Sequence, residues 1–600
     1  MPPTNRPRTP ISGELRPSQL ITTFGPGAVV DQRTASTITA SLDHWEVGDD
    51  QRIDEPRLRA MLRVRNLYRP RSKSDSGLRG IPAFVFPRYL VCPRCELLAS
   101  YEHFLFDGRR FRCRNRDGHK NINVPKKGPV AYPARFVIAC PAGHLDDFPW
   151  SDYVHRGPGS SCDPLQLTFF EGNESGAVSQ LFVRCRACKQ SRSMADAFEE
   201  NSSRVLGSCP GERPWIGTAD AEPGCSEDVR TVLRGASNLY FSVVQSALSI
   251  PEWDDPVHAA IAYYDGLEKV RTYEELGLAM QFFDRLAPFA QENVWDALQA
   301  RRGVESDPPT PTSLRFEEFK ALCAPPDPVA QADRQFQTEH MEVPQVFAGQ
   351  IGQLVVVRRL REVRALAGFT RIDSPPDILI EGDEHQQDVK QQPLARDDPG
   401  WRPAVELLGE GVFLALDERQ VQAWEQRPAV AARVAEMERA HAEWRREREL
   451  GDAPYPGPRF VLLHSLAHML INSLALDCGY SSTSIRERIY SSPSSDRPMA
   501  GILLYTATPD SDGSLGGLAD QGKTARFENV LTTALGRARY CSSDPLCGHA
   551  PPGSMGHLNG AACHACLLVS ETSCERSNRY LDRAHVTETV SHLGTEFFNG

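Results

Sequence analysis

Apolar and polar residues follow one another in blocks that predict different elements along the chain. Residues 83–86 have the composition of a short strand, and residues 347–361 predict a strand centred on the apolar run 354–357. Between residues 257 and 302, apolar side chains recur at the spacing of amphipathic helices. The pattern therefore indicates strands on either side of a helical middle region.

The last quarter of the chain opens with a predicted buried helix. Residues 459–478 are mostly apolar and contain neither Pro nor Gly. His464 and His468 are four residues apart, so they lie on one face of this helix. Residues 484–490 predict a second helix, and residues 501–506 predict a buried strand.

A strand and a helix are also expected just before this quarter. Residues 411–416 are apolar and predict a strand. Residues 418–450 are rich in charge and predict one long helix.

Composition narrows the class of protein. The chain has 600 residues and a net charge of -11, which excludes a generally basic protein that coats DNA. The sequence opens on a polar, Pro-rich stretch without an apolar signal region, and its apolar runs predict no membrane span. Its 16 cysteines occur in clusters, which favours thiolate-bound zinc in a reducing cytoplasm over disulfides. We therefore expect a cytoplasmic protein of several domains.

The first cluster predicts a zinc ribbon. Cys92 and Cys95 form a CxxC pair, and Cys113 follows a hairpin-like stretch. A fourth cysteine is expected three residues after Cys113, but Arg116 occupies that position. The fourth ligand is therefore open, and the candidates for it are His119, Cys140 and His144.

The second cluster predicts a site with four thiolate ligands. Cys185 and Cys188 form another CxxC pair, and Cys209 and Cys225 follow. Four cysteines within 41 residues of a cytoplasmic chain favour a structural zinc ion, because four thiolates leave no position for water.

The third cluster closes the chain. Its cysteines are Cys541, Cys547, Cys563, Cys566 and Cys574. The pair at 563 and 566 is again CxxC, and which four of the five bind metal is left open. In total, the sequence predicts Zn²⁺ at two or three sites.

These elements predict an α+β protein of several domains. It combines N-terminal zinc-ribbon-like β modules, a helical middle region and a mainly helical C-terminal zinc-binding domain. The expected boundaries are an N-terminal segment with a Gly-Pro-Gly turn at 1–90, two zinc-ribbon-like modules at 91–250, a helical region at 251–342, a strand pair with the charged helix at 343–450, and the zinc-binding domain at 451–600.

Two patterns raise the question of catalysis. Residues 517–524 fit the phosphate-loop spacing, but residues 509–516 separate them from the preceding strand, whereas a working loop leaves its strand at once. His464 and His468 are candidate functional histidines, which Glu487 could join, although paired histidines on an apolar helix more often bond within the core. With neither helicase nor HKD nuclease motifs in the chain, the sequence does not favour an enzyme.

One basic cluster is a candidate for contact with DNA. Its members are Arg358, Arg359, Arg361 and Arg364. They follow the apolar core 354–357 of the predicted strand and could contact phosphates, while a salt-bridged surface is the alternative.

The order of motifs resembles two known families. The matching segments of the C-terminal quarter are 464–490, 516–518, 562–566, 571–575 and 578–583. They resemble the zinc-binding domain of MrfA-type DNA-repair helicases. The matching N-terminal segments are 19–28, 140–150 and 234–241. They resemble DrmB, a component of the DISARM anti-phage defence system.

This resemblance implies a function. It implies a non-catalytic zinc-binding accessory subunit that partners a DISARM helicase, DrmA, and recognises or engages phage DNA as part of that complex. One alternative is an enzyme with a His/Glu or nucleotide site in the C-terminal domain. The other is a pure protein-interaction scaffold that does not contact DNA.

Overall fold

The computed structural model describes residues 15–598 with short internal gaps. The omitted residues are 33–34, 72–79, 121–122, 158–161, 163–165, 173–176, 199–205, 218–220, 223, 252–255, 265–266, 327–334, 375–390, 449–451, 479–480, 482, 509–516 and 555–557. The segment 509–516, which separates the phosphate-loop pattern from its strand, thus lies outside the described residues.

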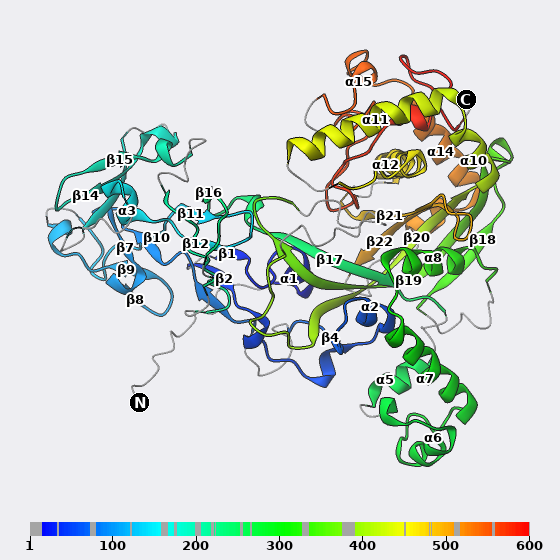
Figure 1. Ribbon diagram of the computed structural model, residues 1–600, viewed down its shortest axis with the longest axis horizontal. Coiled ribbons are helices and arrows are strands. Elements are labelled where there is room, and N and C mark those ends of the chain that lie inside the picture. Colours follow the sequence, from blue (N-terminus) through cyan, green and yellow to red (C-terminus); the bar gives the residue numbers. More distant parts are fainter. Residues whose placement is uncertain are drawn as a thin grey trace.

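An eight-stranded sheet runs through the middle of the molecule (Figure 1). Its main path is β17-β19-β20-β22-β21, and β18, β4 and β3 extend it. The longest strands are β19 (Ile351–Thr370) and β20 (Trp401–Leu416). The others are β3 (Arg52–Ile53), β4 (Asn66–Tyr68), β17 (Phe241–Leu248), β18 (Gln337–Met341), β21 (Ile485–Ser492) and β22 (Met499–Thr508).

The strand predicted at 347–361 is confirmed from Ile351 onward as part of β19, and the strand predicted at 411–416 is confirmed as part of β20. β19 runs nine residues beyond the predicted end, because its second half pairs with both β17 and β20. Val363, Ala365 and Phe369 in that half are completely buried, although charged neighbours interrupt the apolar pattern. Pairing with strands from distant parts of the chain thus extends β19 beyond the point at which the local apolar pattern predicts its end.

The N-terminal lobe, residues 87–234, lies at one end of this sheet (Figure 1). It contains a six-stranded sheet in the order β10-β6-β7-β13-β14-β15, a three-stranded sheet β12-β11-β16 and the hairpin β8-β9. The strands are β6 (Tyr89–Val91), β7 (Leu97–Ser100), β8 (Phe104–Phe106), β9 (Phe111–Cys113), β10 (Tyr132–Pro133), β11 (Phe136–Ala139), β12 (Leu145–Asp147), β13 (Leu167–Glu171), β14 (Leu181–Cys185), β15 (Ser191–Ser193) and β16 (Arg230–Leu233). The helix α3 (Trp150–His155) packs beside β14 and β15.

A smaller module joins the lobe to the central sheet. It consists of α1 (Pro17–Thr22), the three-stranded sheet β1 (Val29–Asp31), β2 (Ser36–Thr39) and β5 (Ala83–Val85), and α2 (Pro56–Met61). The Gly-Pro-Gly turn lies between α1 and β1. A Cβ on Gly27, whose φ is +86°, would lie 2.4 Å from the ring of Phe369. The turn therefore packs closely on β19, consistent with a structural role.

The helical middle region divides into two parts. The helices α5 (Pro256–Tyr263), α6 (Tyr273–Ala279) and α7 (Gln291–Ser306) share a small core and project away from the sheet (Figure 1). The next helix, α8 (Pro311–Cys323), packs on β19, β21 and β22 instead.

The C-terminal lobe, residues 417–598, contributes β21 and β22 to the central sheet, and its helices cover one face of that sheet (Figure 1). Its helices are α10 (Glu418–Glu425), α11 (Pro428–Glu447), α12 (Pro458–Cys478), α13 (Gly517–Gln521), α14 (Thr524–Ala538) and α15 (Leu546–His549). The buried helix predicted at 459–478 is confirmed as α12, which packs on β21, β22 and α14.

Two predictions in this part were wrong. Residues 484–490 form strand β21 rather than a helix, because their backbone pairs with β22 from Ile485 to Ser492. The predicted helix 418–450 is divided into α10 and α11. The second helix begins at Pro428, where the proline ring favours a first helical position over a helix interior.

One helical segment, Pro458–Leu476, is long and apolar enough to cross a membrane. However, 83% of that window is buried inside the protein. It belongs to α12 and serves as the core helix of the C-terminal lobe.

Candidate metal centres

Five groups of four potential metal ligands occur among the described residues. In each group the ligand atoms all lie within 4.8 Å of one another. The groups are cluster 1 (Cys92, Cys95, Cys113, His119), cluster 2 (Cys140, His144, Cys209, Cys225), cluster 3 (His155, Cys162, Cys185, Cys188), cluster 4 (Cys541, Cys547, Cys563, Cys566) and cluster 5 (His464, His468, Glu487, Cys574).

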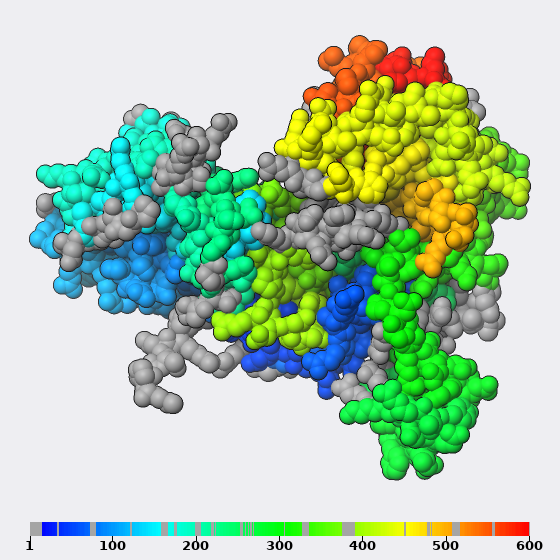
Figure 2. Space-filling model, viewed as in Figure 1, coloured from blue at the N-terminus to red at the C-terminus, as the bar shows by residue number. Residues whose placement is uncertain are grey.

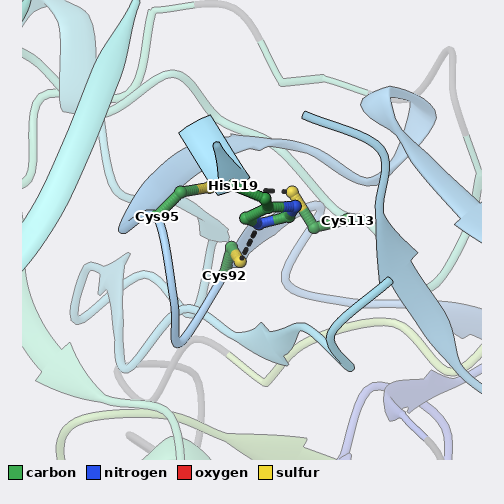
Figure 3. A group of neighbouring side chains, drawn as sticks. All are labelled: Cys92, Cys95, Cys113 and His119. Atoms are coloured by element: carbon green, nitrogen blue, oxygen red, sulfur yellow. Dashed lines mark hydrogen bonds between the residues drawn. The ribbon is translucent and has the colours of Figure 1, made fainter. Parts of the chain in front are cut away.

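Cluster 1 lies between β6, β9 and the turn that follows β9 (Figure 3). The Nε2 atom of His119 is 3.4 Å from Sγ of Cys92, and the sulfurs of Cys95 and Cys113 are 3.8 Å apart. Hydrogen bonds from Cys113 and then Cys95 lower the pKa of Cys92. A thiolate beside two further thiols and an imidazole fits a tetrahedral zinc site.

His119 takes the fourth position that the sequence left open. Gly118 lets its turn approach the cluster, since a Cβ there would lie 2.9 Å from Cβ of Cys95. The other two candidates, Cys140 and His144, belong to cluster 2 instead.

Cluster 2 joins the end of β11 to the loop that precedes β16. Sγ of Cys140 lies 3.4 Å from Nδ1 of His144 and 3.6 Å from Sγ of Cys209. The hydrogen bond from Cys209 lowers the pKa of Cys140 to about 4. On the other side of the ring, Nε2 of His144 lies 3.2 Å from the carboxylate of Glu222. A carboxylate on the outer nitrogen of a ligating histidine is a common way to orient the ring.

Cluster 3 joins α3 to the turn after β14. Nε2 of His155 is 3.4 Å from Sγ of Cys162, and its Nδ1 is 2.8 Å from the carbonyl oxygen of Ser151. Because a carbonyl only accepts, Nδ1 carries the proton and Nε2 is free to act as a ligand.

Clusters 2 and 3 correct the grouping that the sequence predicted. The expected site of Cys185, Cys188, Cys209 and Cys225 is divided, because β14 places the first two beside His155, while the last two reach the end of β11. Sequence reasoning missed His155 and Cys162 as partners. Cys140 and His144 had been noticed, but nothing local indicated that Cys209 and Cys225 fold back onto them.

Cluster 4 contains four of the five C-terminal cysteines, which answers the question that the sequence left open. The sulfurs of Cys541 and Cys563 are 3.4 Å apart, and those of Cys547 and Cys566 are 3.7 Å apart. The hydrogen bond from Cys566 lowers the pKa of Cys547 to about 6. Four cysteine sulfurs at these distances fit a closed structural zinc site. The fifth cysteine, Cys574, lies elsewhere.

Cluster 5 contains both candidate functional histidines. His464 and His468 project from α12, and their rings are 4.5 Å apart. Nε2 of His464 lies 3.1 Å from Oε1 of Glu487 and 3.2 Å from Sγ of Cys574. The two histidines and Glu487 are almost completely buried. The structure thus brings these residues together, and adds a thiol that spacing did not suggest.

A cavity of about 1070 Å³ adjoins cluster 5. It lies where β17, α8, β21 and the segment 571–579 meet, and Glu487 and Cys574 reach its wall. Five arginines also line it, namely Arg315, Arg364, Arg486, Arg576 and Arg579. Four glutamates line it as well, namely Glu362, Glu487, Glu571 and Glu575, and Arg315 and Arg364 pair with Glu575 and Glu362. The lining therefore carries both signs of charge, and its guanidinium groups are of the kind that bind anions.

The arginines predicted to contact DNA lie on β19, and three of them have carboxylate partners. The pairs are Arg358 with Glu339 and Asp520, Arg361 with Glu406, and Arg364 with Glu362. Arg359 is half-buried, at a position where β19 pairs with β18. This surface is therefore largely salt-bridged, as the alternative reading expected, and only Arg364 also reaches the cavity.

The residues that match the phosphate-loop spacing, 517–524, do not form a loop around an open anion site. Residues 517–521 form helix α13, and Lys523 pairs with Asp520 at 2.7 Å. The hydroxyl of Thr524 donates to the carbonyl oxygen of Glu342 at 2.8 Å. Both side chains that would serve a nucleotide thus have protein partners, so the geometry does not favour nucleotide binding.

Comparisons with known proteins agree with the motifs. Residues 16–241 match a domain of unknown function, DUF8724, and residues 466–567 match the MrfA Zn-binding domain. The DISARM protein DrmB of Bacillus paralicheniformis is 30% identical over 594 residues, which cover 95% of this chain and 100% of that protein. Both predicted resemblances and the α+β fold class are confirmed. The chain also contains a zinc-binding domain, within which all of cluster 4 lies.

Proposed function

Because this chain belongs to the DrmB family of DISARM proteins, we propose that it is a non-catalytic zinc-binding accessory subunit, which partners the helicase DrmA and engages phage DNA within that complex. The observation that carries this proposal is the 30% sequence identity to a DISARM protein, which extends over the whole length of that protein. The MrfA Zn-binding domain supports it, because the resemblance to MrfA-type helicases implies a domain suited to work beside a helicase motor.

The composition of clusters 1–4 supports a structural role for zinc. Each offers four cysteine or histidine ligands, which would fill a tetrahedral zinc ion and leave no position for a reacting water.

An exposed apolar surface next to cluster 4 suits a protein partner. Tyr540, Leu546 and Leu593 are 72%, 81% and 69% exposed. Their two segments are held together by His592, whose Nε2 lies 3.1 Å from the carbonyl oxygen of Gly548. In Figure 2 the orange and red segments that contain them form the outer end of the C-terminal lobe. Apolar side chains on a rigid support are typical of binding surfaces, so we assign this one to DrmA.

The partner surface can be tested by charge substitution. Leu546→Asp and Tyr540→Asp should weaken binding of purified DrmA at least tenfold, as measured by biolayer interferometry, without lowering the melting temperature. Leu278→Asp is a matched control, because Leu278 is 63% exposed on α6. Equal affinity in all four proteins would refute the assignment.

DNA engagement can be tested by its dependence on salt. We expect the complex with DrmA to bind duplex DNA with an affinity that falls steeply as salt rises. Arg486→Gln or Arg579→Gln in the cavity should each reduce the slope of log K against log salt by about one. Arg446→Gln is the control, because its side chain is 76% exposed on α11, outside the cavity.

A scaffold without DNA contact is the second candidate. The observation that favours it is the pairing of Arg358, Arg361 and Arg364 with carboxylates, which reduces their availability to phosphates. If salt slopes are the same with and without this subunit, while DrmA binding is intact, the scaffold function holds and DNA engagement does not.

A further inference from the structure

Cluster 5 differs from the other four groups in composition and position. It combines two imidazoles, one carboxylate and one thiol, whereas clusters 1–4 contain only cysteine and histidine. Two of its members, His464 and Cys574, lie outside the residues 466–567 that match the zinc-binding domain. It also borders the cavity, through Glu487 and Cys574.

The hydrogen bonds of His468 leave two acceptors facing each other. Nδ1 of His468 lies 2.9 Å from the carbonyl oxygen of Leu567, so Nδ1 carries the proton and Nε2 of the neutral ring presents a lone pair. That lone pair is 3.5 Å from Oε2 of Glu487. Among the described residues, neither atom has a hydrogen-bond partner, and both are buried. Two buried lone pairs at this distance repel each other unless a cation lies between them.

The backbone around Cys574 resembles that of the cysteines in the other clusters. Sγ of Cys574 accepts N–H bonds from Arg576 at 3.3 Å and Asn578 at 3.2 Å. In three other clusters, a cysteine sulfur likewise accepts a hydrogen bond from the backbone N–H two residues later. These cysteines are Cys92 in cluster 1, Cys209 in cluster 2 and Cys541 in cluster 4. Such N–H groups stabilise a thiolate, which is the form that binds metal.

The remaining contacts fix the carboxylate. Oε1 of Glu487 accepts the backbone N–H of Glu575 at 2.9 Å, and the N–H of Glu487 donates to the carbonyl oxygen of Ser573 at 3.1 Å. Strand β21 and the turn that carries Cys574 are therefore joined on both sides of the cluster. All four donors are of types that zinc accepts, and backbone hydrogen bonds hold three of them, His468, Glu487 and Cys574, in place before any ion binds.

We propose that His464, His468, Glu487 and Cys574 bind a Zn²⁺ ion, in a metal centre separate from the Cys541–Cys566 site and adjacent to the arginine-lined cavity. The ion would sit between Nε2 of His468 and Oε2 of Glu487 and neutralise both. Without it, a proton must lie between Nε2 of His468 and Oε2 of Glu487, and that proton-sharing cluster is the competing explanation.

Native mass spectrometry of the full-length chain, produced with zinc and without chelators, tests the proposal by counting metal ions. We expect His468→Gln and Cys574→Ser each to carry one zinc fewer than the unsubstituted chain. Cys323→Ser is the matched control, since this half-buried thiol at the end of α8 belongs to none of the five groups, and its zinc count should not change. An unchanged count in both His468→Gln and Cys574→Ser would overturn the proposal.

A second measurement does not depend on the stability of the variants. Anomalous scattering from crystals of the unsubstituted chain at the zinc edge should give a peak about 2.0–2.3 Å from the four ligand atoms. A peak at cluster 4 with none at cluster 5 would establish the proton-sharing alternative. Neither measurement involves DNA or DrmA, so the result is independent of the proposed function.

Discussion

Arg371 joins three segments that are far apart in the chain. It is completely buried, and its guanidinium donates to the carbonyl oxygens of Gly27 at 2.6 Å, Gly143 at 3.0 Å and Leu239. These carbonyls belong to the three N-terminal segments that resemble DrmB. Burial lowers the pKa of Arg371 to about 9, so the side chain is still a cation at neutral pH.

Replacing this side chain should separate the three segments. Arg371→Met keeps most of the volume but removes the donors to all three carbonyls. Hydrogen bonds to a charged group contribute about 1.5–3 kcal/mol each, and part of that sum is offset because the buried charge is also removed. We therefore expect a net loss of about 3–5 kcal/mol, because three buried carbonyls lose their donor and each unsatisfied buried group costs about 1–3 kcal/mol before that offset.

Hydrogen exchange followed by mass spectrometry is the appropriate assay, because a chain of several lobes does not unfold in one step. In Arg371→Met, the amides of segments 25–30, 140–145 and 237–242 should lose protection together. Arg371→Lys should have an intermediate effect, because one ammonium cannot reach all three carbonyls. Arg446→Met, at a 76% exposed side chain, is the control. Loss of protection at only one segment would refute the idea that Arg371 couples them.

Two further predictions concern the metal clusters and the core. Cys225→Ala should make Cys140 and Cys209 reactive toward alkylating reagents while Cys185 stays protected; if all three react alike, the division into clusters 2 and 3 is incorrect. Arg488→Ala should lower the opening free energy of β21 by about 3–5 kcal/mol, because the buried Glu318 would lose its partner at 2.7 Å, and Glu318→Gln in the same chain should restore part of the loss. Hydrogen exchange across β21 measures both values, and an additive double variant would contradict a direct pair.

The sequence was most informative where local pattern decides the structure. The apolar run 354–357 and the helix 459–478 were recognisable because their side chains are buried as their spacing predicts. The stretch 484–490 was not, since Glu487 and Arg488 are both buried in a strand whose polar partners come from distant segments. The charged side chains of β21 are paired inside the core, but in the sequence they have the composition of a solvated helix.

The metal clusters show the same limit. CxxC pairs mark ligands that share one turn, and the sequence identified all three such pairs. The other ligands come from segments brought close only by folding, such as His155 to Cys185. For Cys574, the distinguishing feature is the pair of backbone N–H groups on its sulfur, which spacing does not reveal.

The order of ligands along the chain has a consequence for assembly. The ligands of cluster 3, residues 155–188, all lie between His144 and Cys209 of cluster 2. Likewise, the ligands of cluster 4, residues 541–566, lie between Glu487 and Cys574 of cluster 5. Closing an inner loop first shortens the segment that the outer site must span, and so lowers the entropy lost when that site closes. If zinc fills these sites, the new chain should load its inner ions first, so a cell short of zinc would accumulate chains whose outer sites are still open.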